Sequence, residues 1–329
     1  MSTAIKIPSS TNRWRRDLPA CLVGGACATV VISIAVSQIL LALAFTNGSG
    51  RARHSGIVPT RWLMPLLGFA LWTVLSLAFS DAPLAGLSQI KKLVLLAVIP
   101  ITYTAFTRAS QIDWTVRATL LAAFTRGAWL GTLVGFSYLV YSYRKWLVPL
   151  IPAGLLILYL AAPDALQKRE QSIVAPESDS SIQSRLVMAR TGLAMIADHP
   201  LFGVGPERVA PMFEQYRPVG ITLPPAWYGH LHNSFMHFAA ERGLPALAFF
   251  VWLIVVILRA NYRLTSASNA ATAALAHTAV AATLGMIVLG AFEYNFGDSE
   301  VLMLYLFFAT LPLAASRLEL IDIKTEPRP

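Results

Sequence analysis

The sequence predicts an all-α protein that crosses a membrane several times, and both its composition and its long apolar runs carry this prediction. Of the 329 residues, 56% are hydrophobic and 13% are charged, which is too apolar for a soluble globular protein of this size. A membrane-spanning helix needs roughly 20 apolar residues to cross about 30 Å of hydrocarbon. We therefore expect a lipid bilayer as partner and about eight transmembrane helices, over residues 21–45, 62–79, 93–106, 118–141, 146–162, 243–258, 272–292 and 301–315.

The basic residues predict how these helices are oriented. The net charge of +9 indicates topology more than a nucleic-acid partner, because short cytoplasmic loops of membrane proteins collect Lys and Arg. Basic clusters precede the first run and follow the second, fourth, sixth and last runs, which predicts that both termini are cytoplasmic and that Lys91, Lys92, Arg144, Lys145, Arg259 and Arg263 face the cytoplasm. The loop at 46–61 disagrees, because it carries three arginines yet falls outside in this scheme. The orientation of the first hairpin is thus left open.

The chain divides at its one long polar stretch. We expect a cytoplasmic tail at 1–20, transmembrane helices at 21–162, an outer loop at 163–242, further transmembrane helices at 243–316 and a cytoplasmic tail at 317–329. Within the loop, apolar residues recur at helical spacing and predict an amphipathic helix that ends at Asp198–Pro200; they are Leu186, Ala189, Leu193 and Ile196 or Ala197. Gly203 and Gly205 favour a turn over a phosphate loop, because no strand precedes them and no lysine follows.

The end of this loop gathers ionisable residues in the stretch "WYGHLHNSFMHFAAERG". Asn233 is a natural helix cap, and on the helix that follows, His237 and Glu241 lie four residues apart and can meet. His230 and His232 form a His-x-His pair that invites a zinc interpretation. Because the nearby glutamates lack a diagnostic spacing for a third ligand, we expect no metal and no other cofactor.

Two further stretches carry a family resemblance. The segment "SRLVMARTGLAMIADHPLFGVGPERV", followed by "HLHNSFMHFAAERGLPAL", resembles the signature of the O-antigen ligase and O-antigen polymerase superfamily. The order of its arginine-bearing helix, Pro-x-x-Gly-x-Gly turn, His-Asn pair and Glu-x-Gly agrees with that family. The stretch "FTRGAWLG" at 124–131 is similar to the family's Ser-Arg-Gly-Ala helix start and contributes Arg126. The chain departs from the family in having fewer expected spans and Ala246 in place of a glycine.

The resemblance implies a GT-C-like, inverting and metal-independent glycosyltransferase in the bacterial inner membrane, with its active site facing the periplasm. Such an enzyme moves a glycan from undecaprenyl diphosphate to a hydroxyl of lipid A-core or a similar acceptor, a step of lipopolysaccharide biosynthesis. His232 would be the catalytic base. Guanidinium groups suit the diphosphate, so the expected substrate-binding residues are Arg126 and Arg185, with Arg190, Glu241 and His230 beside them.

The residues themselves leave alternatives open. Arg126 lies within an apolar run, so it could instead reach the lipid headgroups or pair with Glu241 or Glu293. His232 could merely hydrogen-bond a backbone carbonyl, and Glu241 could pair with Arg242 or His237. At the level of function, the alternatives are an O-antigen polymerase, a shortened protein without catalytic activity, and a transporter.

Overall fold

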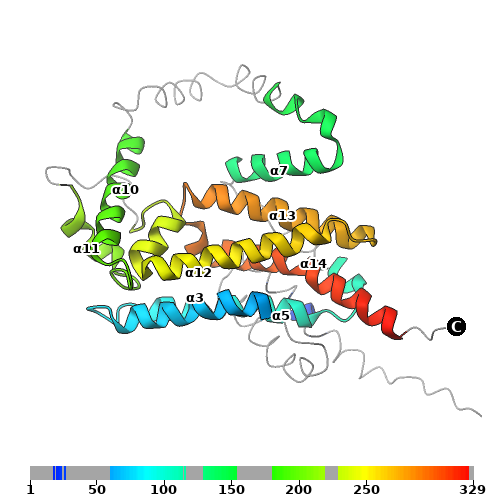
Figure 1. Cartoon of the computed structure of the whole chain (residues 1–329), viewed down its shortest axis with the longest axis horizontal. Helices are drawn as coiled ribbons and strands as arrows, with labels where there is room; N and C mark the ends of the chain where they lie inside the picture. Colours follow the sequence, from blue (N-terminus) through cyan, green and yellow to red (C-terminus); the bar gives the residue numbers. More distant parts are fainter. Residues whose placement is uncertain are drawn as a thin grey trace, which may run out of the picture.

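The computed structural model describes residues 18, 20–23, 26, 60–113, 115, 129–153, 180–218 and 229–325, and the regular structure within these ranges is helical. Figure 1 shows the helices over 60–78, 234–264, 270–290 and 299–325 lying side by side, with those over 180–198 and 209–216 at one end. The elements are α3 (Thr60–Ala78), α4 (Leu87–Lys92), η1 (Leu93–Ala97), α5 (Val98–Ala105), α7 (Trp129–Tyr143), η2 (Lys145–Leu147), α10 (Ser180–Asp198), α11 (Val209–Tyr216), α12 (Ser234–Leu264), α13 (Ala270–Gly290), η3 (Asn295–Gly297) and α14 (Ser299–Thr325).

Five segments of the described chain are long and apolar enough to cross a membrane, and they confirm a helical protein with several membrane spans. They are Arg61–Ala78, Leu87–Ala105, Ser234–Leu264, Ala270–Gly290 and Ser299–Ile321. The expected run at 118–141 is described from residue 129 onward, as α7, which packs against α13. The expected run at 21–45, and the part of the run at 146–162 beyond residue 153, lie mostly or wholly outside the described residues.

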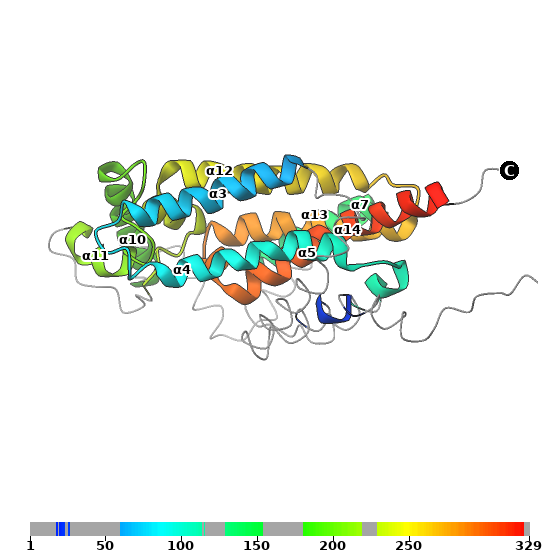
Figure 2. The same cartoon turned by 90° about the horizontal axis from the view of Figure 1, so that it is seen from below.

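The second of these spans begins earlier than its apolar run. We expected it at 93–106, but α4, η1 and α5 follow one another without a break from Leu87 to Ala105 (Figure 2). Lys91 and Lys92 therefore form the last turn of α4 instead of a loop. Hydropathy misses this turn because two lysines interrupt the apolar run.

The helix α3 runs antiparallel to α12. Gly68 lies against Phe249, whereas the Ser76 hydroxyl donates to the carbonyl oxygen of Glu241 over 3.4 Å. The end of α3 also meets the turn that follows α10, because Trp72 donates its indole N–H to the Leu201 carbonyl over 3.0 Å. The turn between α3 and α4 therefore lies at the same end of the bundle as His230, His232 and His237, which we call the histidine end.

This arrangement corrects the expected topology. We expected Lys91 and Lys92 on the face opposite to the histidines, but Lys92 Nζ donates to the Gly297 carbonyl at the histidine end over 3.2 Å. Conversely, α3 begins at the opposite end, so Arg61 is on the same side as Arg259 and Arg263 of α12. Arg61, the one arginine of the 46–61 loop that the structure describes, then no longer conflicts with Arg259 and Arg263. The charge rule fails at Lys92 because it counts lysines without regard to whether the protein itself binds them.

A small second core joins α10 and α11 to the start of α12. Its buried side chains include Met188, Met195, Val204 and Phe213, packed against Ala240. The predicted helix is confirmed as α10, which ends at Asp198 as expected, but its expected buried face is wrong. Leu186 and Leu193 are 50% and 58% exposed. The second core instead contacts the neighbouring face of α10, because that face carries apolar side chains as well.

The turn at 200–205 is confirmed, and it packs against a break in α12. At Gly243 the backbone has φ 85°, and here Leu244 N donates to the Pro200 carbonyl over 2.8 Å. Gly205 N donates in turn to the carbonyl of Glu241 over 2.9 Å. A β-carbon on Gly243 would lie 1.9 Å from the carbonyl oxygen of Leu201, so this contact requires glycine. The break leaves a short, buried first section of α12, from Ser234 to Arg242, that carries the ionisable side chains.

Candidate functional site

Three side chains that are far apart in the sequence meet at the histidine end. Glu293, in the loop between α13 and α14, accepts a bond from Arg185 Nη2 on α10 over 3.2 Å through Oε1. Its other oxygen, Oε2, lies 2.9 Å from His232 Nδ1. Arg185 Nη1 also donates to the Phe292 carbonyl over 2.9 Å. The structure therefore brings Arg185 and His232 together through one carboxylate, and we call these three residues the Arg–Glu–His group.

The backbone holds His232 firmly against the α13–α14 loop. Asn233 caps α12 by accepting from Met236 N over 2.9 Å, and its amide donates to the Ala291 carbonyl over 3.0 Å. The next hydroxyl, on Ser234, donates to the Glu293 carbonyl over 2.9 Å. His232 itself has φ 46°, a left-handed conformation that costs a non-glycine residue roughly 1–2 kcal/mol. Such strain is retained where the surroundings fix it, and it occurs often at functional sites.

The hydrogen bond to Glu293 decides which nitrogen of His232 can act as a base. A carboxylate only accepts hydrogen bonds, so Nδ1 carries the proton and Nε2 carries the lone pair. The imidazole is 13% exposed, against 42% for the Arg185 side chain and 37% for Glu293. The group therefore combines a sheltered, oriented base with a guanidinium that remains open to solvent.

His230 and His237, the two other histidines of the histidine end, lie beside the Tyr294 ring. The His230 ring lies 4.3 Å from the His232 ring and 5.8 Å from the Tyr294 ring, and the His237 ring lies 3.9 Å from Tyr294. Burial, together with the neighbouring imidazoles of His232 and His237, lowers the pKa of His230 to about 4. At neutral pH His230 is therefore uncharged, and it would meet a substrate as a hydrogen-bonding group and not as a cation.

Glu241 lies beneath the site and is 1% exposed. It accepts from Glu207 N over 2.9 Å, and its carboxylate lies 3.1 Å from Arg242 Nη2 and 3.7 Å from His237 Nε2. These are the pairings that the sequence left as alternatives to substrate binding. The geometry favours a supporting role, in which Glu241 holds the turn at 200–207 against α12.

Arg190, the other expected site residue that the structure describes, is not brought to the group. Arg190 is exposed on α10, and five residues of helix place it about 140° around the axis from Arg185. Arg126 lies outside the described residues, so its expected role stays a prediction. In the described part of the chain, no set of three or more His, Cys, Asp or Glu side chains is placed to hold a metal ion.

These observations define the class of protein: a multi-pass helical membrane protein with a histidine, carboxylate and arginine group at one end of its bundle. Residues 112–251 match the family model of O-antigen ligase, so this part of the chain is similar to that family. No curated protein matches the chain. The match confirms the resemblance found in the sequence and includes both Arg185 and His232.

Glu293 lies beyond the matched segment, and it is not among the site residues expected from the sequence. From the sequence it is only an alternative partner for Arg126. Its actual partners are 61 and 108 residues away along the chain. Helical spacing predicts only contacts between residues a few positions apart, so it could not identify these partners. The available signal was its position: a carboxylate directly after an apolar run, in a short loop predicted to face the same side as His232.

Proposed function

We propose that this protein is an O-antigen ligase-like inverting glycosyltransferase, which moves a glycan from undecaprenyl diphosphate to a hydroxyl of lipid A-core at the periplasmic face of the inner membrane. The observation that carries this proposal is the hydrogen bond from His232 to Glu293, made beside Arg185. It supplies an oriented base and a cation within one group, as transfer from a diphosphate requires. The family match over 112–251 supports the class of reaction.

In the proposed reaction, an acceptor hydroxyl attacks the anomeric carbon of the donor from the face opposite to the diphosphate. The new C–O bond forms while the bond between the anomeric carbon and the phosphate oxygen breaks, and the diphosphate leaves with the electron pair. His232 Nε2 takes the hydroxyl proton, and Glu293 stabilises the imidazolium that results. General-base catalysis of this kind contributes roughly 100- to 10,000-fold to the rate.

Arg185 is placed to bind the leaving group. Its guanidinium is held by Glu293 and a backbone carbonyl, yet nearly half of its surface is open to solvent. An exposed ion pair contributes only about 0–1 kcal/mol, so a diphosphate can compete with Glu293 for the guanidinium. The negative charge that grows on the leaving oxygen then meets a fixed cation. Arg126 is proposed as a second cation for the same diphosphate.

The experiment is transfer by the purified full chain in proteoliposomes, with an undecaprenyl diphosphate-linked glycan as donor and lipid A-core as acceptor. We expect glycan attached to lipid A-core, seen as a shift on a gel, and a loss of at least about 100-fold in rate for His232→Ala. Longer lipid-linked chains, formed without lipid A-core, would instead assign a polymerase.

A matched pair of variants on α10 tests the arginine. We expect Arg185→Ala to lower the transfer rate by about 100-fold, whereas Arg190→Ala, on the exposed face of the same helix, should stay within about 3-fold of the parent. Equal activity of the Arg185→Ala and Arg190→Ala proteins would overturn the role of Arg185. Normal transfer by His232→Ala would overturn the base.

A further inference from the structure

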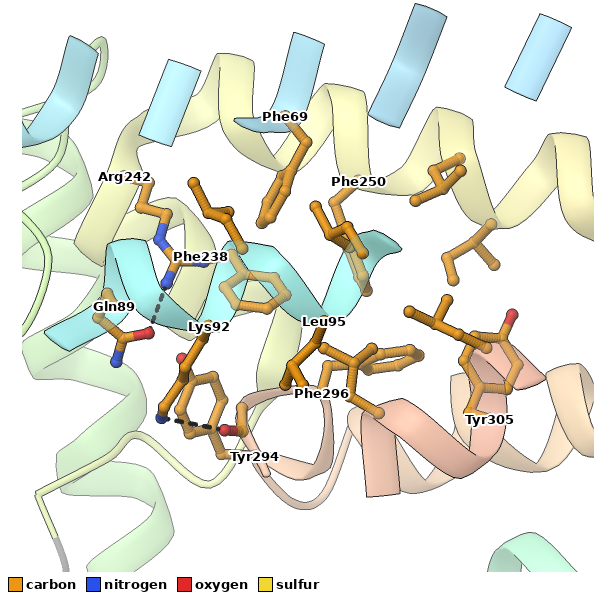
Figure 3. Close-up of a pocket in the computed structure, with 17 residues that line it drawn as sticks. Phe69, Gln89, Lys92, Leu95, Phe238, Arg242, Phe250, Tyr294, Phe296 and Tyr305 are labelled. Atoms are coloured by element: carbon orange, nitrogen blue, oxygen red, sulfur yellow. Dashed lines mark hydrogen bonds between the residues drawn. The ribbon is translucent and has the colours of Figure 1, made fainter. Parts of the chain in front are cut away.

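An apolar cavity lies next to the Arg–Glu–His group but is separate from it. Segments of α3, α4, η1, α12 and α14 line it, together with the loop that contains Tyr294, and none of Arg185, His232 and Glu293 is among its lining residues. Figure 3 shows its polar side chains at one end and aromatic and aliphatic side chains along the rest. The cavity therefore has one polar end and a long apolar part, which matches the shape of an amphiphilic molecule.

The polar end is rich in hydrogen-bond donors. Lys92 and Arg242 line it, and none of the described lining residues is acidic, but the buried carboxylate of Glu241 lies 3.1 Å from Arg242 Nη2 just outside the lining. Arg242 is 4% exposed, and its guanidinium stacks over Phe238 at 4.9 Å and donates from Nη2 to Gln89 over 3.0 Å. Two buried donors there, Arg242 Nε and the Tyr294 hydroxyl, have no hydrogen-bond partner within the described structure. Unpartnered buried donors are costly, so this end is suited to an acceptor.

The hydroxyl of Tyr294 remains a donor at any physiological pH. Burial, with the nearby carboxylate of Glu241, raises the pKa of Tyr294 well above its ordinary value. Its proton is therefore available to an anion at the polar end of the cavity.

The apolar part of the cavity runs along the helices. On α12 its lining residues lie on both sides of the break at Gly243, and the unbroken stretch from Leu244 to Ile254 rises roughly 15 Å. Phe250, Leu253 and Leu306 lie along this length. The length suits one extended alkyl chain of a dozen carbons or more.

We propose that this cavity binds a long-chain fatty acid, with its carboxylate at Arg242, Lys92 and Tyr294 and its alkyl chain along α12 and α14. A carboxylate offers two oxygens to the two unpartnered donors, and guanidinium–carboxylate bonds are strong. The guanidinium of Arg242 is buried, so the head must be small, which separates this ligand from a glycan-bearing diphosphate. The site is independent of the transfer reaction proposed above.

The test is photolabelling of the full chain in phosphatidylcholine nanodiscs with palmitate that carries a diazirine in mid-chain. We expect saturable labelling of the peptides around 250–254 and 302–306, competed by palmitate at least 5-fold better than by hexadecanol and not by acetate. Equal competition by hexadecanol, which lacks a carboxylate, would show that the cavity does not recognise an anion and would overturn the proposal. Competition by undecaprenyl phosphate without competition by palmitate would assign the cavity to the glycan carrier and overturn the fatty acid.

Paired variants make the result independent of folding. We expect Lys92→Gln and Tyr294→Phe each to reduce labelling by at least 3-fold, whereas Lys91→Gln, at the exposed neighbouring position, should leave it unchanged. Leu253→Trp fills the cavity and should abolish labelling. Its control, Val251→Trp, lies on the same helix at a position that is 41% exposed. Full labelling of a folded Leu253→Trp protein would overturn the site, whatever the transfer activity.

Discussion

At the scale of single residues, Glu293 is the side chain on which the proposed chemistry depends. In the proposed reaction it is a positioning residue, because it would act on the acceptor through His232, and it contacts Arg185 at the same time. Glu293→Gln keeps the size of the side chain but removes the charge and allows an N–H to face Nδ1. The imidazole then loses its preference for the tautomer with a lone pair on Nε2.

We expect Glu293→Gln to lower kcat of the transfer reaction by roughly 10- to 1,000-fold, with a smaller effect on the donor KM because Arg185 keeps its bond to the Phe292 carbonyl. Glu293→Asp retains the charge and should recover part of the rate. Steady-state kinetics in proteoliposomes measure both constants. If Gln and Asp variants are equally impaired in kcat, the charge of Glu293 is not what matters.

The burial of His230 makes a second prediction at this scale. Its pKa is lowered from 6.5 to about 4 in the folded protein, so between these values the unfolded chain binds more protons than the folded chain. Folding stability should therefore fall as the pH is lowered from about 6.5 to about 4. We expect His230→Gln to reduce this loss, measured as a smaller drop in Tm over that range. His199→Gln, a change of the histidine next to Tyr216, serves as the comparison.

At the scale of elements, the contact between the turn at 200–205 and the break in α12 holds the site together. Gly243→Ala would place a methyl group 1.9 Å from the Leu201 carbonyl, at a φ of 85°. We expect a loss of about 3 kcal/mol or more in stability, or a failure to fold. Gly229→Ala has a similar φ of 83° but meets only the Ala210 side chain at 3.4 Å. It should cost roughly 1–2 kcal/mol. Thermal unfolding in detergent compares the two, and equal costs would show that the close approach at Gly243 is unimportant.

The same elements show how far the sequence can predict this site. Asn233 predicted the start of α12 because capping is a local signal, and the spacing of His237 and Glu241 predicted their contact for the same reason. The buried face of α10 was predicted wrongly. Leu186 and Leu193 have apolar neighbours on the adjacent face, and the spacing of apolar residues alone does not say which of the two faces packs against the core. Glu293 could not be placed by spacing, because its contacts depend on how α10 and the α13–α14 loop meet.

At the scale of the whole molecule, the apolar runs predicted the spans well and the charges predicted their direction less well. The runs at 62–79 and 272–292 agree closely with α3 and α13, because hydrocarbon thickness fixes the length of a span, whereas α14 continues to Thr325, ten residues beyond the run at 301–315. The direction of α3 could not be read from Lys91 and Lys92. Lys92 has a partner in the Gly297 carbonyl at the histidine end, and this contact joins segments some 200 residues apart.

The orientation of α3 gives a test that needs no enzymatic activity. In a background with Cys21→Ser and Cys27→Ser, single cysteines are placed at Ala85, in the exposed α3–α4 turn, and at Ser268, in the exposed α12–α13 turn. Because these turns lie at opposite ends of the bundle, a membrane-impermeant maleimide applied to whole cells should reach one cysteine and not the other. If the histidine end faces the periplasm, Ala85→Cys is labelled in intact cells and Ser268→Cys only after permeabilisation. The reverse pattern would turn the proposed active site toward the cytoplasm, and labelling of both in intact cells would contradict the antiparallel packing of α3 on α12.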